Sequence, residues 1–318
     1  MKIVVTDAKT ITNGDISLEY LKKYGDVEIY GLTDASQTAE RIADADMVIV
    51  NKTVLDRENM KNATNLKYIG LFATGYNNID IEYAKKQGIA VCNAGSYSTN
   101  AVAQQVFSYV LAHSNRTADY DAFVRSGGWK KSETFSPFVF PINELDGKVI
   151  GIVGYGSIGK KVAEIARVFG MKVLAYTRTP KEDANVRFCS LDELLENSDY
   201  VTVHCPLNQA SNKMFGADAF KKMKKSAYFI NTARGGVTDE AALAGAVKDG
   251  VIAGAAVDVL TTEPMSEDCP LFDVENLTVT PHIAWAPIET RMRLMDIVED
   301  NVKSFLEGTP KNDVTKFY

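Results

Sequence analysis

Short hydrophobic runs alternate with amphipathic segments along most of the chain. Between residues 1 and 93 the apolar runs are KIVVTD, VEIYGL, MVIVN, LKYIGLFAT and IAVCN. Runs of this length are typical of strands buried in a parallel sheet, and the segments between them predict helices. These helices are expected near Ser17–Tyr24, Thr38–Ala43 and Ile81–Gln87. The alternation therefore predicts βα units on a parallel sheet, which is an open α/β domain.

After Cys92 the pattern changes to one extended helical period. Apolar residues recur at helical spacing from Ser98 or Asn100 through Val124, which predicts one long helix. A helix of this length either crosses between domains or packs against a partner chain. Residues 127–143 are rich in Gly, Ser, Phe and Pro and predict a loop arm. Its aromatic residues form a subunit interface or are buried on their own domain; they are Trp129, Phe135, Phe138 and Phe140.

The stretch from Val149 to Arg178 reads as strand, tight turn, helix and strand. The first apolar run breaks into three glycines at the spacing G-x-G-x-x-G, and a helical pattern follows. In such a turn the glycines permit the bend, let backbone amides approach a pyrophosphate at the helix N-terminus, and allow close packing. The alternative is a glycine-rich turn that binds no nucleotide. The predicted cofactor contacts at this turn are Gly154, Gly156, Ser157, Ile158 and Gly159.

Beyond Arg178 strands and helices alternate again, and they fill the six-strand order of a dinucleotide fold. The expected fold class is α/β, with two doubly wound parallel-sheet domains. A Rossmann dinucleotide-binding domain, residues 99–287, is inserted into a flavodoxin-like substrate domain formed by residues 1–98 and 288–318. The amphipathic last helix, Ile288–Leu306, is expected to return to the substrate domain.

The composition of the chain indicates its cellular compartment and argues against some classes of partner. The 318 residues are enough for two domains, and 46% hydrophobic with 24% charged residues is ordinary for a globular protein. A net charge of −6 gives no indication of nucleic-acid or anionic-membrane binding. The chain opens directly on a strand, and no apolar run approaches a membrane span, so we expect a cytoplasmic protein. The cysteines show no metal-like spacing, which predicts reduced thiols and no metal; they are Cys92, Cys189, Cys205 and Cys269.

Polar residues follow several predicted strands, at the edge where a dinucleotide fold carries out its chemistry. They are His204, Arg234, Asp258, Glu263 and His282. Each has an ordinary structural explanation when taken alone. Together they supply an arginine fork for a carboxylate, a histidine that can transfer a proton, and a carboxylate that can orient that histidine. Those are the groups that hydride chemistry on a 2-oxo acid requires.

Three strings follow GYGSIG in order: NTARGG, DVLTTEP and TPHIAWA. Together with GYGSIG, these three strings resemble the D-isomer-specific 2-hydroxyacid dehydrogenase family. The resemblance covers essentially the whole chain, which looks most like the glycerate dehydrogenase/hydroxypyruvate reductase branch. The resemblance implies that Arg234 binds the substrate carboxylate and polarises the carbonyl, that His282 is the acid/base, and that Glu263 is hydrogen-bonded to His282. It implies that amides of Thr74 and Gly75, in the turn ATGYNNID, hold the substrate carboxylate. From the residues alone that turn is equally an ordinary β-to-α turn. The residues implied to line the nicotinamide side are His204, Cys205, Pro206, Thr232, Ala233 and Asp258.

Two positions depart from the usual family pattern. The long helix carries Gln104 where family members commonly have a glutamate. The second nucleotide strand ends in Thr177, Arg178 and Thr179, where an NAD enzyme normally has Asp or Glu for the ribose 2′-OH. These residues can instead bind a 2′-phosphate, so NADP is the favoured cofactor and NAD is possible.

The expected function is reduction of a small 2-oxo acid, hydroxypyruvate or glyoxylate first, to the D-2-hydroxy acid. One alternative is another family enzyme, such as a D-lactate dehydrogenase; a phosphoglycerate dehydrogenase would carry an additional C-terminal regulatory domain. An alternative from another class is an NAD(H)-gated corepressor, which retains the same Arg, Glu and His; the short chain, with little disorder, counts against it. The long helix and aromatic arm predict a homodimer.

Overall fold

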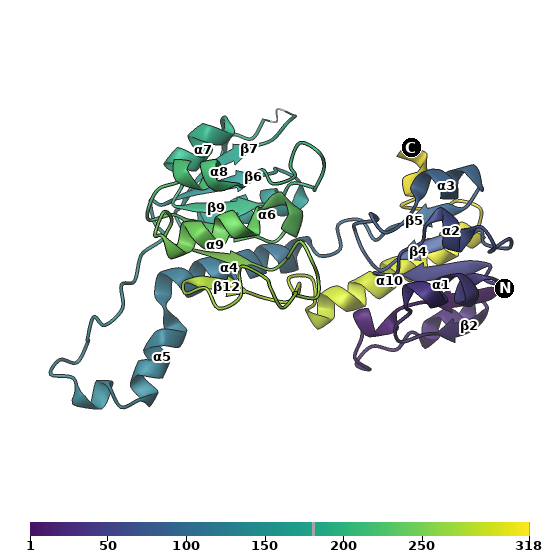
Figure 1. The fold of residues 1–318 in the computed structure, drawn as a ribbon, viewed down its shortest axis with the longest axis horizontal. Helices are drawn as coiled ribbons and strands as arrows, with labels where there is room; N and C mark the ends of the chain where they lie inside the picture. The colour runs from purple at the N-terminus through teal and green to yellow at the C-terminus, as the bar shows by residue number, and fades with distance from the viewer. Residues whose placement is uncertain (180–181, 318) are drawn as a thin grey trace. The chain divides into compact units, whose positions relative to one another are not determined.

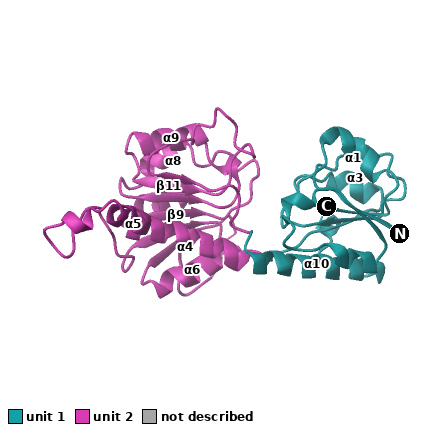
Figure 2. Cartoon of the chain, turned by 90° about the horizontal axis from the view of Figure 1, so that it is seen from below, with its two compact units in different colours: residues 1–97, 286–318 teal, residues 98–285 magenta. Residues whose placement is uncertain are grey.

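The computed structural model describes residues 1–179 and 182–317, and the chain divides into two compact units (Figure 2). Unit 1 comprises residues 1–97 and 286–318, and unit 2 comprises residues 98–285. The boundaries expected from the sequence, after residues 98 and 287, lie within two residues of these. No helix in the described ranges is long and apolar enough to cross a membrane.

Unit 1 is built on a five-stranded parallel sheet with the order β2-β1-β3-β4-β5 (Figure 1). This is the flavodoxin-like order, as predicted. Strands β3 and β4 are buried throughout, because α10 covers one face of the sheet and α1 and α3 cover the other (Figure 2). The elements are β1 Lys2–Val5, η1 Ala8–Thr10, η2 Glu19–Lys23, β2 Asp26–Ile29, α1 Ala35–Ile42, β3 Met47–Val50, α2 Arg57–Met60, β4 Tyr68–Leu71, α3 Ile81–Lys86, β5 Ala90–Cys92, α10 Ile288–Leu306 and η5 Val314–Phe317.

Unit 2 is built on a seven-stranded parallel sheet with the order β12-β11-β10-β9-β6-β7-β8. This is the Rossmann order with one strand added at the β12 edge. Helices α4 and α6 cover one face, and α8 and α9 the other (Figure 2). The elements are α4 Thr99–Asn115, α5 Thr117–Arg125, η3 Trp129–Lys131, β6 Val149–Val153, α6 Ser157–Val168, β7 Lys172–Tyr176, β8 Arg187–Phe188, α7 Leu191–Asn197, β9 Tyr200–Val203, α8 Ala217–Lys222, β10 Tyr228–Asn231, η4 Gly235–Val237, α9 Glu240–Lys248, β11 Gly254–Val257 and β12 Leu277–Val279.

The prediction of one long helix after Ser98 is wrong. The chain bends between α4 and α5 (Figure 1), because Arg116 adopts a left-handed backbone conformation with φ 51° and ψ 34°. The Arg116 guanidinium pairs with the carboxylate of Asp119 and lies 5.5 Å from the ring centroid of Phe140. These contacts anchor a residue that neither glycine nor proline marks as a helix break.

Candidate active site

One row of paired residues crosses the unit 2 sheet where its strands end. The register aligns Tyr176, Val153, Val203, Asn231, Val257 and Val279, each the last residue of its strand. The residues that follow are therefore brought to one edge of the sheet, the edge where open α/β folds bind ligands. They are Thr177, Gly154, His204, Thr232, Asp258 and Thr280.

The glycine turn after β6 fits a dinucleotide. Gly154 has φ 101°, and a Cβ there would lie 2.5 Å from the backbone nitrogen of Cys205, so only glycine fits. A Cβ on Gly159 would lie 2.3 Å from the Gly154 carbonyl oxygen, which explains the close approach of α6 to the turn. A Cβ on Gly156 would meet no atom within 4 Å. The protein's own packing does not demand glycine at Gly156, which is consistent with open space for a pyrophosphate at the N-terminus of α6.

Two buried polar atoms at the same edge of the sheet have no hydrogen-bond partner in the described ranges: His204 Nδ1 and Thr232 Oγ1. The other ring nitrogen of His204 lies 3.0 Å from Thr202 Oγ1. Burial lowers the pKa of His204 to about 3, so its ring is neutral at pH 7. Unpaired buried polar atoms cost free energy, and a bound group with hydrogen-bonding atoms, such as a nicotinamide carboxamide, would satisfy them.

The end of β7 carries a cation at the same edge. Arg178 and Thr179 are exposed and Thr177 is half-buried. Tyr176 pairs with Val153 across the sheet, which brings Arg178, two residues beyond Tyr176, into the neighbourhood of the glycine turn after Val153. Burial raises the pKa of the Cys205 thiol, and the positive charge of Arg178 acts in the opposite direction. The hydroxyl of Tyr155, in the turn itself, donates to Asp183 at 2.7 Å and so ties the chain after β7 to the turn.

Glu263 and His282 form a hydrogen-bonded pair. His282 Nδ1 lies 2.7 Å from Glu263 Oε2, with both side chains about one-third exposed or less. The other oxygen of Glu263 accepts from the backbone amide of Leu260 at 3.0 Å, so both carboxylate oxygens are hydrogen-bonded. His282 has a left-handed φ of 55°, and its own amide donates to the carbonyl of Asp258 at 2.8 Å.

Asp258 organises the turn that carries His282. Its carboxylate is 1% exposed and accepts hydrogen bonds from the amides of Ile283 at 2.9 Å and Ala284 at 2.8 Å. It also accepts from the hydroxyl of Thr280, which in turn is paired with Tyr109 of α4. Sequence reasoning placed Asp258 among the residues that line the nicotinamide side. The structure shows that its carboxylate oxygens accept from the amides of the histidine turn, and its role toward the cofactor stays a prediction.

Arg234 lies in a turn whose backbone is held by hydrogen bonds with the side chain of Asn231. The Asn231 side chain is fully buried, accepts from the amide of Ala233 at 2.9 Å and donates to the carbonyl of Arg234 at 3.0 Å. The exposed Arg234 guanidinium donates to the Ala233 carbonyl at 2.7 Å. A Cβ on Gly235 would lie 1.9 Å from the carbonyl carbon of Leu260, so this turn touches the loop of Glu263 backbone to backbone. Sequence reasoning missed Asn231 and Gly235, although an asparagine in the last position of a buried strand is a signal.

Thr74 and Gly75 lie in unit 1, in the turn that follows β4. The Thr74 hydroxyl donates to the Gly95 carbonyl, and the side chain of Asn93 donates to the Thr74 carbonyl at 2.8 Å. These bonds fix the turn at the carboxyl edge of its own sheet. The role of the two residues toward substrate stays a prediction, as do those of Pro206 and Ala233 toward the cofactor.

A family model described as the NAD-binding domain of D-isomer specific 2-hydroxyacid dehydrogenases matches residues 107–284, the span that holds the glycine turn, Arg234, Glu263 and His282. The chain belongs to the D-isomer-specific 2-hydroxyacid dehydrogenases. It is therefore an oxidoreductase that transfers a hydride between a nicotinamide cofactor and a small 2-oxo or 2-hydroxy acid. The nicotinamide, when bound, supplies or accepts that hydride.

Individual relatives of this dehydrogenase extend over nearly its whole length. A hydroxypyruvate reductase from Blautia hydrogenotrophica is 39% identical over 99% of this chain and 100% of its own. A glycerate dehydrogenase from Methylorubrum extorquens is 41% identical over 87% of this chain and 88% of its own. The crystal structure of an NADPH-dependent glyoxylate/hydroxypyruvate reductase from Sinorhizobium meliloti superimposes with a TM-score of 0.84 at 27% identity, covering 98% of this chain and 97% of that one.

Proposed function

We propose that this dehydrogenase reduces hydroxypyruvate to D-glycerate, and glyoxylate to glycolate, with NADPH as the preferred hydride donor. The observation that carries the chemistry is the Glu263–His282 pair beside the carboxyl edge of the nucleotide-binding sheet. Because Glu263 holds Nδ1 of the ring, Nε2 is the nitrogen that is left to exchange a proton with substrate. His282 then donates a proton to the carbonyl oxygen as the hydride reaches the adjacent carbon.

Arg234 binds the substrate in this proposal. A guanidinium can donate to a carboxylate and a neighbouring carbonyl oxygen at once, which orients the 2-oxo acid and polarises its carbonyl. The hydrogen bonds of the Asn231 side chain support this role, because they fix the backbone that carries the exposed Arg234 side chain. Amides of Thr74 and Gly75 are proposed as further donors to the substrate carboxylate.

The choice among 2-oxo acids rests on the relatives. The proteins from Blautia, Methylorubrum and Sinorhizobium are named for hydroxypyruvate, glycerate or glyoxylate. A panel of hydroxypyruvate, glyoxylate, pyruvate and 2-oxoglutarate, each with NADPH and NADH, tests the proposal by loss of nicotinamide absorbance. We expect the highest kcat/KM with hydroxypyruvate. A higher value with pyruvate would favour the D-lactate alternative, and tight nicotinamide binding without turnover would favour a cofactor-gated binding protein.

The preference for NADPH rests on the end of β7. The three residues that follow β7 are Thr177, Arg178 and Thr179, and none of them is acidic. An acidic residue would accept from the ribose hydroxyls and repel a 2′-phosphate, whereas a guanidinium and two hydroxyls can donate to it. The relative from Sinorhizobium is named as NADPH-dependent, which supports the same preference.

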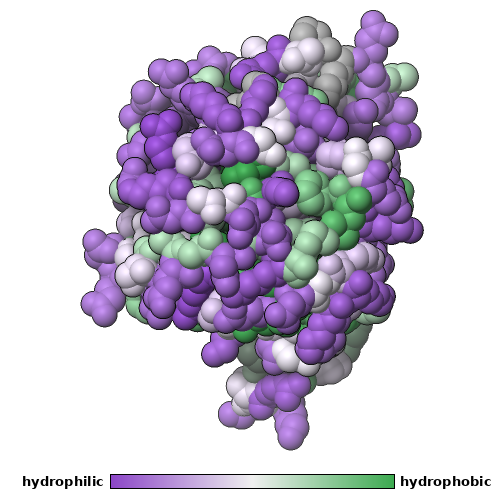
Figure 3. Space-filling model, turned by 90° about the vertical axis from the view of Figure 1, so that its right-hand side faces the viewer, coloured by the Kyte–Doolittle hydropathy of each residue, from purple (hydrophilic) through white to green (hydrophobic). Residues whose placement is uncertain are grey.

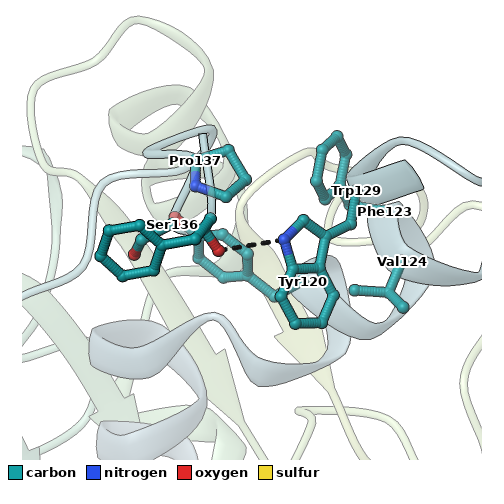
Figure 4. Close-up of a pocket in the computed structure, with 7 residues that line it drawn as sticks. Tyr120, Phe123, Val124, Trp129, Ser136 and Pro137 are labelled. Carbon is teal, nitrogen blue, oxygen red and sulfur yellow. Dashed lines mark hydrogen bonds between the residues drawn. The ribbon is translucent and has the colours of Figure 1, made fainter. Parts of the chain in front are cut away.

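We also infer a homodimer that forms through the loop arm of residues 127–143 and the neighbouring helix α5. Hydrophilic side chains cover most of the face drawn in Figure 3. The arm, which belongs to unit 2, exposes Phe135 at 91% and Phe138 at 90%. Trp129 Nε1 donates to the Phe135 carbonyl at 3.0 Å, and both residues line a pocket of about 210 Å³ (Figure 4). Such an aromatic surface is typical of an interface between subunits.

A further inference from the structure

The loop that carries Glu263 is exposed. Every residue from Thr261 to Asp268 is exposed to solvent, so burial of apolar side chains does not hold this part of the chain in place. Yet the Glu263 carboxylate must stay within hydrogen-bonding distance of His282 Nδ1 to orient the ring, and it does so at 2.7 Å. The position of the loop therefore depends on specific polar contacts.

One of those contacts comes from a residue outside the catalytic group. Glu240 Oε1 accepts a hydrogen bond from the backbone amide of Thr261 at 2.6 Å. The preceding amide, that of Leu260, donates to Glu263 Oε1 at 3.0 Å. Two carboxylates thus hold two consecutive amides of the loop, one from outside the loop and one from within it. Charge-assisted hydrogen bonds of this kind are stronger than those between neutral groups.

The element that supplies Glu240 is itself fixed to the Arg234 turn. Glu240 is the first residue of α9, and η4, Gly235–Val237, joins it to Arg234. At Gly235 the same segment touches the backbone of Leu260, where a Cβ would lie 1.9 Å from the carbonyl carbon. The backbone contact and the Glu240 hydrogen bond therefore connect the substrate-binding arginine and the Glu263–His282 pair through neighbouring residues.

We propose that Glu240 is a positioning residue for catalysis: by holding the Thr261 amide, it keeps Glu263 on His282 and keeps that pair in register with Arg234. The inference rests on the proposed roles of those three residues. In the proposed mechanism Glu240 touches neither the substrate nor the reacting atoms. It acts through the loop, and its loss affects the proton-transfer step rather than the binding of the cofactor.

An acidic residue in the first turn of a helix also stabilises the helix through its dipole, and Glu240 occupies such a position in α9. Two substitutions separate the roles. Glu240→Gln keeps the acceptor oxygen at the same reach and removes the charge. Glu240→Asp keeps the charge at the helix N-terminus but is one methylene shorter and does not reach the Thr261 amide. The positioning role requires reach, and the dipole role requires charge.

The experiment compares kcat and KM for hydroxypyruvate, the Kd for NADPH and the melting temperature in wild type and both variants. We expect Glu240→Asp to lower kcat about tenfold, the factor that corresponds to loss of one charge-assisted hydrogen bond, with the Kd and melting temperature unchanged. Glu240→Gln is expected to stay within about threefold of wild type. The reverse order, or equal losses that follow the melting temperature, overturns the proposal.

A second measurement reads the geometry without turnover. The chain has three histidines, so the His282 Nδ1 resonance in ¹⁵N-histidine-labelled protein can be assigned by its disappearance in His282→Ala. We expect this resonance to move in Glu240→Asp and to stay in place in Glu240→Gln. An unchanged resonance in both variants overturns the positioning role even if the wild type reduces no 2-oxo acid. A shift in a protein without such activity would instead leave the positioning role standing and reject the proposed function.

Discussion

The carboxylate of Asp258 accepts a hydrogen bond from the backbone amide of Ala284 at 2.8 Å, and so reaches past His282 to the far side of the turn. Its other oxygen accepts from Ile283 at 2.9 Å. The histidine itself is in a left-handed backbone conformation, which L-amino acids adopt only when their surroundings impose it. A buried carboxylate therefore fixes the backbone that carries His282, the proposed proton donor.

We predict that Asp258→Asn lowers both stability and kcat. The new amide group directs N–H donors at one of the backbone amides that Asp258 now accepts from, so a buried donor loses its partner at a cost of about 1–3 kcal/mol. Loosening of the turn should lower kcat about 10- to 100-fold. Urea unfolding and steady-state kinetics measure the two effects. Unchanged kcat in a correctly folded variant would show that the turn holds His282 without Asp258.

His282→Ala should abolish turnover and leave cofactor binding intact. Loss of a general acid typically costs 10²–10⁴-fold in rate, and nothing else in the Glu263–His282 pair can donate the proton. The matched variant Glu263→Gln keeps the imidazole but weakens its orientation, so it should fall between wild type and His282→Ala. NADPH titration by fluorescence supplies the binding control. A kcat near that of wild type in His282→Ala would remove the proposed mechanism.

The sequence predicted the parts of the fold that repeat a short pattern. Buried strands and the glycine turn follow from local hydrophobic runs and from turn chemistry, and the structure confirms them. The two parallel-sheet fold classes are confirmed as well, although the unit 2 sheet has seven strands where six were expected. The break at Arg116 was not predictable in this way, because an arginine in a left-handed conformation depends on contacts with Asp119 and Phe140 that form only in the folded chain. Helix α2, of four residues, is too short to show a period.

At the site, the sequence indicated which residues follow the strands but not how their side chains are used. Asp258 follows a buried strand, and the structure adds that its carboxylate accepts from the amides of Ile283 and Ala284 in the histidine turn. The close approach of Gly235 to Leu260 and the hydrogen bond from Thr261 to Glu240 join segments 25 and 21 residues apart, and no local pattern encodes such a contact. Backbone packing between loops decides these contacts.

The arm should hold two copies of the chain together. We predict a mass of twice 34.9 kDa by light scattering at micromolar concentration, and a monomer for the double variant Phe135→Ser/Phe138→Ser, which removes both exposed rings. Val168→Ser is the matched control, because Val168 is 87% exposed on α6, outside the arm. A monomeric wild type, or a double variant that remains a dimer, would contradict an interface at these phenylalanines.

Acid should destabilise unit 2 through His204. Burial lowers the pKa of His204 to about 3, whereas an unfolded histidine has a pKa of about 6.5. The unfolded state therefore binds more protons below pH 6.5, and stability falls as the pH drops, by up to about 1.4 kcal/mol per pH unit. Between pH 7.5 and 5 we expect wild type to lose about 2 kcal/mol more than His204→Gln. Urea unfolding followed by tryptophan fluorescence reports unit 2, because Trp129 and Trp285 both lie in it; parallel curves for the two proteins would contradict the prediction.

The preference between the two nicotinamide cofactors should depend on Arg178. Arg178, with Thr177 and Thr179 beside it, should pair with the 2′-phosphate of NADPH, and none of these three residues is a carboxylate that would repel that phosphate. Charge-assisted hydrogen bonds contribute roughly 1.5–3 kcal/mol each, so one or two give a preference of about ten- to a thousandfold. We expect kcat/KM with NADPH to exceed that with NADH by this factor in wild type, and the ratio to collapse in Arg178→Ala through loss of NADPH efficiency alone. Arg187→Ala is the control, because Arg187 is also exposed in unit 2 but pairs with Glu193 at 2.8 Å. A wild-type preference for NADH would show that Arg178 does not contact the cofactor phosphate, whereas an Arg178→Ala variant that loses both cofactors equally would assign the residue to folding rather than to recognition.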